Sequence, residues 1–144
     1  MIMLDTNVIS EPLRKAPESR VIEWIDAQAI ETLFLSAITV AEVRFGVALL
    51  PPGKRKDRLR DRLESEVVPL FAERVLPFDL AVTRTYAELM AKARATGLTI
   101  GTSDGLIAAT AAANRMTIAT RDTKPFAAAG VPTMNPWESS LHEA

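Results

Sequence analysis

The sequence predicts an α/β fold, a three-layer sandwich in which helices cover both faces of a central, mostly parallel sheet of four or five strands. Two observations favour it: short apolar stretches typical of buried strands alternate with longer segments of helical periodicity, and this alternation continues along most of the chain. Parallel strands need such crossover helices. At 144 residues the chain suits one domain. We expect this domain to span residues 1–138 and a C-terminal tail to follow at 139–144.

The first half of the chain predicts two strands, each followed by a helix. Residues 2–4 form an apolar run, and a Pro-Glu-Ser start signal at 17–19 precedes apolar residues at helical spacing. Residues 32–35 predict the second strand. The mostly apolar segment at 38–50 is too long for a strand, and the Pro-Pro-Gly breaker at 51–53 ends the helix that it predicts.

The second half repeats the alternation. An apolar stripe predicts a helix whose other face carries basic residues, and Gly97 ends a later helix. In chain order we expect a helix at 59–71, a strand at 75–78, a helix at 81–95, a helix at 104–114, a strand at 117–119, a short helix at 124–129 and a short fifth strand at 131–134.

The composition narrows the possible chemistry. Cysteine is absent, which excludes disulfides, thiolate zinc sites and a cysteine nucleophile. The only histidine is His142, near the C-terminus, so serine triads and multi-histidine metal sites are nearly excluded. The glycine patterns of phosphate loops and dinucleotide-binding turns are missing as well. Carboxylates or hydroxyls must therefore carry any catalysis.

The charge pattern leaves two interpretations open. The net charge of −1 argues neither for nor against nucleic acid. The basic stretch at 54–62 could follow an RNA backbone, or it could be a solvated helix face with local pairs such as Arg62–Glu66. No apolar run approaches the roughly 18 residues of a membrane span, and the N-terminus lacks the basic region of a signal peptide. We therefore expect a cytoplasmic protein that does not bind membranes.

Four carboxylates are expected at one edge of the sheet. In parallel α/β sheets, ligands bind at the carboxyl ends of the strands, where the strand order reverses. Asp5 ends the first strand, and Asp122 follows the fourth. Asp104 begins a helix that leads into a strand, and Glu42 lies in the early turns of the helix after the second strand, so both belong to the same edge.

Glu42 is the most informative of these acids. Only Glu42 and Arg44 are charged between positions 36 and 50, and residues two apart on a helix do not face each other. Thr39 and Gly46 share the face of Glu42 and leave room for a hydrated ion. Ligands that are all oxygens favour hard cations, so the sequence predicts a Mg²⁺ or Mn²⁺ site.

Each acid also has a simpler interpretation as a helix cap. Asp5 could cap a helix at position 7, Ser103–Asp104 could be an ordinary N-cap, and Asp122 could cap the short helix that follows it. Asp79 occupies the same edge, and we expect it to be a cap.

Three other kinds of function stay open. A phosphatase of the haloacid-dehalogenase type places an Asp after its first strand but needs a second Asp where this chain has Asn7. A receiver-like phospho-acceptor would use Asp5 with Lys124 but lacks the paired acids beside the first strand. A non-catalytic module that binds nucleic acid or a protein partner is the remaining alternative.

Four ordered sequence blocks resemble the PIN-domain family. More narrowly, they look like the VapC toxins of bacterial type II toxin–antitoxin systems, in particular the FitB-like branch. The blocks are Met-Leu-Asp-Thr-Asn at 3–7, Ser-Ala-Ile-Thr-Val-Ala-Glu at 36–42, Ser-Asp-Gly-Leu-Ile-Ala-Ala at 103–109 and Ala-Thr-Arg-Asp at 119–122, with Asn-Pro-Trp at 135–137 also typical of that branch.

The resemblance implies a metal-dependent endoribonuclease. Its acids match Asp5, Glu42, Asp104 and Asp122, and Asp5 and Asp104 would be the principal metal ligands. Hydrolysis in this family leaves a 5′-phosphate and a 3′-hydroxyl. The hydroxyls of Thr6 and Thr120 match supporting positions.

The resemblance also implies partners. It predicts a homodimer, able to join a larger assembly, that is neutralised by a cognate antitoxin whose tail occupies the active groove. Arg14, Lys15 and Arg121 lie near the predicted edge and are expected to contact RNA or antitoxin. The helices at 38–50 and 59–71 are expected to supply core and dimer surfaces. Trp24 and Trp137 are expected to be packing residues.

Overall fold

The computed structural model describes residues 1–138, so the expected tail at 139–144, including His142, lies outside the described residues. Within residues 1–138 the sheet has five strands in the order β3-β2-β1-β4-β5, and every neighbouring pair is parallel. The predicted α/β class and the five-stranded alternative are therefore confirmed. The strands are β1 (Ile2–Leu4), β2 (Leu33–Ser36), β3 (Val75–Leu76), β4 (Thr117–Ala119) and β5 (Thr133–Met134).

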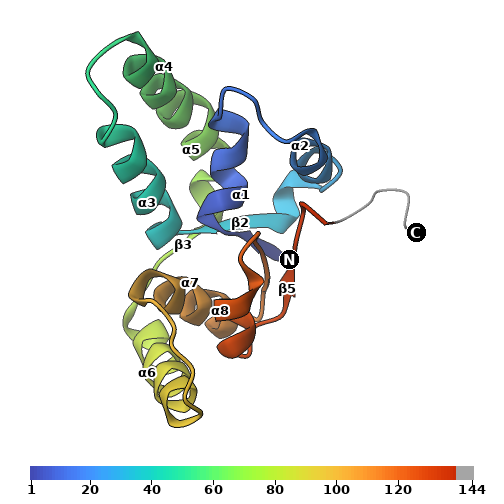
Figure 1. The fold of residues 1–144 in the computed structure, drawn as a ribbon, viewed down its shortest axis with the longest axis vertical. Helices are drawn as coiled ribbons and strands as arrows, with labels where there is room; N and C mark the ends of the chain where they lie inside the picture. Colours follow the sequence, from blue (N-terminus) through green and yellow to red (C-terminus); the bar gives the residue numbers. More distant parts are fainter. Residues whose placement is uncertain (139–144) are drawn as a thin grey trace.

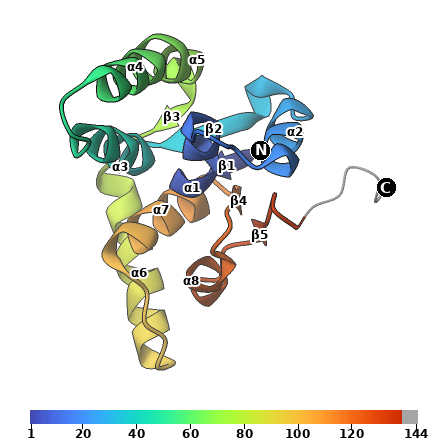
Figure 2. The ribbon, with the colours of Figure 1, turned by 45° about the horizontal axis from the view of Figure 1, so that its top comes forward.

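Helices cover both faces of the sheet, as Figures 1 and 2 show. The first five helices lie on one face and the last three on the other. The α-helices are α1 (Thr6–Ser10), α2 (Ser19–Asp26), α3 (Ala37–Ala48), α4 (Lys54–Arg62), α5 (Val68–Leu70), α6 (Leu80–Ala95), α7 (Thr102–Ala113) and α8 (Thr123–Ala128). Short 3₁₀ helices are η1 (Glu11–Leu13), η2 (Ile30–Thr32) and η4 (Ala72–Arg74), and the π-helical turn η3 spans Leu63–Val67. None of the described helices is long and apolar enough to cross a membrane.

Alternation along the strands produces two hydrophobic cores. Successive side chains of a strand point to opposite faces, so Leu4 packs with the core under α1 to α5 whereas Met3 packs with the core under α6 to α8. Phe126 of α8 is fully buried in the second core. Trp24 is 4% exposed in the first core, and Trp137 packs against it, which confirms their predicted packing roles.

Several predicted strand boundaries need correction, including that of the fifth strand, which begins at Thr133 and not at residue 131. Thr32 belongs to η2, so the second strand begins and ends one residue later than predicted. The third strand ends at Leu76 because Phe78 leaves the sheet and packs edge-on against Tyr86, with 5.9 Å between the ring centroids.

The single helix predicted at 59–71 is wrong in extent and in regularity. Helix α4 already begins at Lys54, in a basic stretch whose few apolar residues hide its periodicity. The chain then passes through the π-helical turn, where the N–H of Val68 donates to the carbonyl of Leu63. A new start at Val68 accommodates Pro69, which has no N–H and cannot continue an α-helical ladder.

A close contact between α6 and α7 sets the position of the α7 N-terminus. A Cβ at Gly105 would lie 2.7 Å from the Met90 sulfur and 3.2 Å from the Tyr86 ring, so any larger residue here requires these two side chains to shift. Helix α6 ends as predicted near Gly97, which has a left-handed φ of 77°. The α6–α7 pair thereby presents Asp104, the neighbour of Gly105, at the start of α7.

Candidate active site

The predicted site lies where the strand order reverses. Strands β2 and β3 follow on one side of β1, and β4 and β5 lie on the other side. Leu4 of β1 pairs with Ala119 of β4, and the N–H of Asp5 donates to the Ala119 carbonyl at 2.9 Å. Asp5 and Thr120 therefore leave adjacent strands side by side, at the position where open α/β sheets bind ligands.

Asp5 acts as a helix cap and also makes a second, unrelated contact. Its Oδ1 accepts a 2.8 Å hydrogen bond from the Thr6 N–H at the start of α1, as the cap interpretation requires. Its Oδ2 accepts a 2.8 Å hydrogen bond from the Thr120 hydroxyl. The side chain is 6% exposed, and this burial raises the pKa of Asp5 even though both hydrogen bonds oppose the shift.

Asp104 is not a helix cap. Gly101 occupies the N-cap position of α7, so the interpretation of Ser103–Asp104 as an ordinary cap is wrong. The Asp104 carboxylate makes no hydrogen bond with any residue in the described part of the chain. Burial raises the pKa of Asp104, and the negative charges of Asp122 and Glu42 raise it further.

Glu42 projects from the second turn of α3 and accepts a 2.8 Å hydrogen bond from the hydroxyl of Thr6. The bond joins α3 to α1 next to Asp5. Arg44 pairs with Glu64 at 2.7 Å, so it offers Glu42 no counter-charge. Thr39, one turn before Glu42 on the same helix face, is fully buried, and its hydroxyl has no partner within residues 1–138.

Asp122 is the most exposed of the four acids. It occupies the N-cap position of α8 but its side chain makes no capping hydrogen bond, so the cap interpretation does not explain it. Its N–H donates to the Thr120 hydroxyl at 3.1 Å. By contrast, Asp79 caps α6 through a 3.1 Å hydrogen bond from the Val82 N–H, as expected.

Asn7 is a site residue that the sequence reasoning missed. Its Nδ2 donates to the Thr120 hydroxyl at 3.4 Å, and its Oδ1 accepts from the Arg121 N–H at 3.2 Å. Asn7 therefore ties α1 to the loop after β4. Its position in the first sequence block, at 3–7, was the signal that could have identified Asn7 as a site residue.

The four carboxylates are near enough to repel one another. Asp5 interacts with Asp104 and Glu42, and Asp104 also interacts with Glu42 and Asp122. Within the described residues, however, no three acidic side chains converge closely enough to hold one ion in this conformation. Glu42 is turned to Thr6, and Asp5 is turned to Thr120. Binding an ion therefore requires these side chains to rearrange.

The chemical type of the four side chains suits a hard divalent cation. All four acidic groups offer oxygen atoms, the ligands that Mg²⁺ and Mn²⁺ prefer. Repulsion between buried Asp5 and the neighbouring carboxylates of Asp104 and Glu42 has no compensating cation in the described residues, and a divalent ion would relieve it.

The predicted contact residues differ in what holds them. Arg14 pairs with Glu11 at 2.8 Å, Arg121 stacks over the Trp137 ring with 5.2 Å from its guanidinium carbon to the centroid, and Lys15 is exposed. In the basic stretch, Arg60 pairs with Asp57 at 3.0 Å, and the expected Arg62–Glu66 pair is present at 3.6 Å. Local pairing thus engages part of this stretch.

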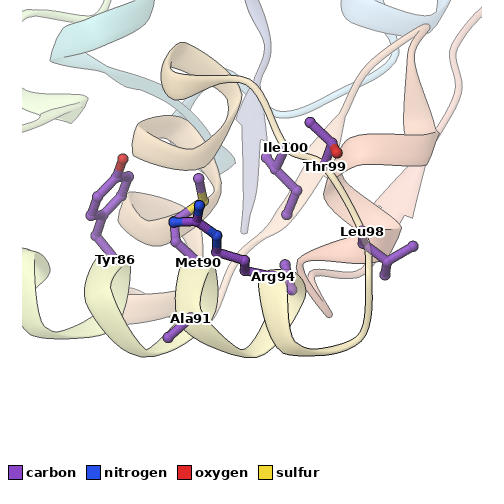
Figure 3. A pocket seen from close by; sticks show the side chains of 8 residues that line it. Tyr86, Met90, Ala91, Arg94, Leu98, Thr99 and Ile100 are labelled. Atoms are coloured by element: carbon purple, nitrogen blue, oxygen red, sulfur yellow. The ribbon is translucent and has the colours of Figure 1, made fainter.

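A separate hollow of about 600 Å³ lies beside α6 and the loop before α7 (Figure 3). Tyr86 and Met90 line it together with Ile100, and Arg94 is its one charged lining residue. Tyr86 and Met90 also lie against Gly105, so the hollow adjoins the first turn of α7. It contains none of the four acids.

Comparison with known proteins gives consistent matches over nearly the whole chain. A model of the PIN domain matches residues 2–131. A VapC ribonuclease of Sinorhizobium fredii is 60% identical over 138 residues, which cover 96% of this chain and 99% of that protein. Toxin FitB of Neisseria gonorrhoeae is 55% identical over 137 residues, covering 95% and 99%. The crystal structure of FitAcB from Neisseria gonorrhoeae matches with a TM-score of 0.94 at 54% identity, covering 96% of this chain and 100% of that chain.

Proposed function

Because the chain belongs to the PIN-domain family, on the branch of the VapC ribonucleases and FitB toxins, we propose that it is the endoribonuclease toxin of a type II toxin–antitoxin module. The observation that carries this proposal is the gathering of Asp5, Glu42, Asp104 and Asp122 at the reversal of strand order, where their charges act on one another. We propose that it acts in the cytoplasm.

We propose that the four acids together bind a divalent ion, Mg²⁺ or Mn²⁺. Asp5 and Asp104 are the principal ligands, and Glu42 and Asp122 complete the set directly or through water. An ion bound there supplies the positive charge that activates a water molecule and stabilises the leaving oxygen of the phosphodiester.

The hydroxyls and Asn7 orient the carboxylates. Thr120 bridges the ends of β1 and β4 by donating to Asp5 and accepting from the N–H of Asp122. Thr6 holds Glu42 in its present orientation through its hydroxyl, and Glu42 would have to leave this hydrogen bond to contact an ion. Asn7 keeps Thr120 and the Arg121 backbone in register.

We propose a homodimer that a cognate antitoxin neutralises. Two large apolar side chains exposed at the C-terminal end of α3 support a dimer face there: Phe45 of α3 is 63% exposed, and Leu49, the residue that caps α3, is 67% exposed. Both residues lie within the range 38–50, which the sequence analysis expects to supply core and dimer surfaces. The antitoxin follows from membership of a toxin–antitoxin family.

The chain alone provides the decisive experiment. Purified protein should degrade single-stranded RNA with Mg²⁺ or Mn²⁺, stop when EDTA is added, and leave 5′-phosphate ends. Asp5→Asn should abolish both cleavage and toxicity on expression while the circular dichroism spectrum is unchanged. Full activity in this variant would contradict the assignment. Turnover of a phosphomonoester would instead indicate a phosphatase, and absence of both activities would indicate a binding module.

A further inference from the structure

Glu11 is a buried carboxylate that the proposed reaction does not use. It begins η1, directly after α1, and its side chain is 2% exposed. A buried charge without a partner is costly. Within the described part of the chain its charged partner is Arg14, whose Nη1 donates to the two Glu11 oxygens at 2.8 and 3.1 Å. An apolar side chain would avoid the cost of burial, so the pair calls for a role beyond packing.

Arg14 connects buried Glu11 to a groove at the surface. Its side chain is 63% exposed, and it lines a groove of about 270 Å³ together with Thr6 and Glu42 from the acid cluster. Arg55 of α4 lines the same groove and has no hydrogen-bond or ion-pair partner among residues 1–138. One groove therefore joins two arginines to a candidate metal ligand.

The elements that line the groove are joined by a contact between residues far apart in sequence. Arg62 of α4 donates to the Pro12 carbonyl in η1 at 2.9 Å, which fixes the two walls relative to each other. Helices α1, α3 and α4 lie on the same face of the sheet in both views (Figures 1 and 2). Apolar side chains of α3 such as Val43 and Val47 line the groove between its walls.

We propose that Glu11 is a positioning residue, and that it fixes Arg14 so that Arg14 and Arg55 bind the backbone phosphates of single-stranded RNA next to the bond that is cut. This inference rests on the proposed ribonuclease function. Four carboxylates repel RNA, and these two cations in the same groove oppose that repulsion. The bond to Glu11 fixes the long Arg14 side chain before RNA arrives, which lowers the entropy lost on binding.

RNA affinity tests the inference without relying on cleavage. All variants are made in an Asp104→Asn background, with Mg²⁺ and a 5′-labelled single-stranded RNA of mixed sequence as the probe. Arg14→Ala and Arg55→Ala should each weaken binding several-fold at every sequence and lower the salt dependence, log Kd against log salt, by about 0.7 per lost phosphate contact. Arg94→Ala removes the same charge from α6, on the opposite face of the sheet, and should change neither quantity.

A double-mutant cycle tests whether Glu11 acts through Arg14. Glu11→Gln should weaken RNA binding, whereas Glu11→Gln combined with Arg14→Ala should bind as well as Arg14→Ala alone. Arg14→Lys should retain part of the affinity. A purely structural role for Glu11 would instead give additive losses and an unchanged salt dependence, and that result would overturn the proposal.

Two further outcomes separate this inference from the proposed function. Unchanged RNA affinity in Arg14→Ala, with weaker inhibition by the co-expressed antitoxin, would assign the groove to the protein partner and overturn the inference. In the chain with Asp104 intact, a raised KM with kcat within twofold in Arg14→Ala would support it. RNA binding that depends on Arg14 in a chain that never cleaves RNA would refute the ribonuclease function and leave the phosphate subsite standing.

Discussion

Replacement of Thr120 by valine removes the hydroxyl that joins the two central strand ends. The side chain is fully buried, its hydroxyl donates to Asp5 at 2.8 Å and accepts from the Asp122 N–H at 3.1 Å, and valine keeps its shape. A hydrogen bond to a charged group contributes about 1.5–3 kcal/mol. The exposed backbone at Asp122 can turn to water, so Thr120→Val should lose about 2 kcal/mol of the free energy of unfolding, or roughly 4–8 °C in Tm for a chain of this size.

Thr120→Ser is the matched control because it keeps the hydroxyl and loses one methyl group, at a cost of about 1 kcal/mol. Urea denaturation measures both stabilities, and cleavage of labelled RNA with Mg²⁺ measures activity. We expect Thr120→Ser to keep most of the activity and Thr120→Val to lose it at least tenfold, because Asp5 is no longer held. The reasoning is refuted if Thr120→Val is as stable as the unchanged chain, or if the serine variant loses as much activity as the valine variant.

Four further predictions follow from the same geometry. Burial and repulsion raise the pKa values of Asp5 and Asp104, so the metal-free folded chain binds more protons than the unfolded chain just above the ordinary carboxyl range, and its stability in EDTA should fall as pH rises through that window. A stability that rises with pH there would contradict this. Asp104→Asn should abolish RNA cleavage. It should also raise the metal-free Tm at pH 7 in thermal denaturation, because it removes a carboxylate that burial and repulsion destabilise. A lower Tm would show that the Asp104 charge does not destabilise the metal-free fold. Mg²⁺ at a hundred times its Kd should stabilise the chain by about 2.7 kcal/mol, and Asp104→Asn should lose most of this shift. Gly105→Ala should cost about 1–3 kcal/mol by pressing on Met90 and Tyr86, despite the better helix propensity of alanine, and unchanged stability would mean that Met90 moves freely.

Much of the fold was predictable because its signals are local. The strand at 117–119 was predicted with its observed bounds, and Ser36 caps α3 through its hydroxyl, next to the predicted start of that helix. The predictions failed where periodicity carried no signal. The basic start of α4 has few apolar residues, and the π-helical turn before Pro69 follows from a tertiary fit of that segment.

The sequence by itself determined the order of the elements and the expectation that four acids meet at one edge of the sheet, since strand ends and helix starts follow from hydrophobic patterning along the chain. These acids are Asp5, Glu42, Asp104 and Asp122. Only the tertiary structure decided which partner each polar group takes. The Thr6–Glu42 and Thr120–Asp5 hydrogen bonds join residues 36 and 115 positions apart, and the buried pair of Glu11 and Arg14 depends on what packs around η1. Hydrogen bonds act over a few ångströms, so their partners are set by the order and spacing of the packed strands and helices, which no local pattern in the chain encodes.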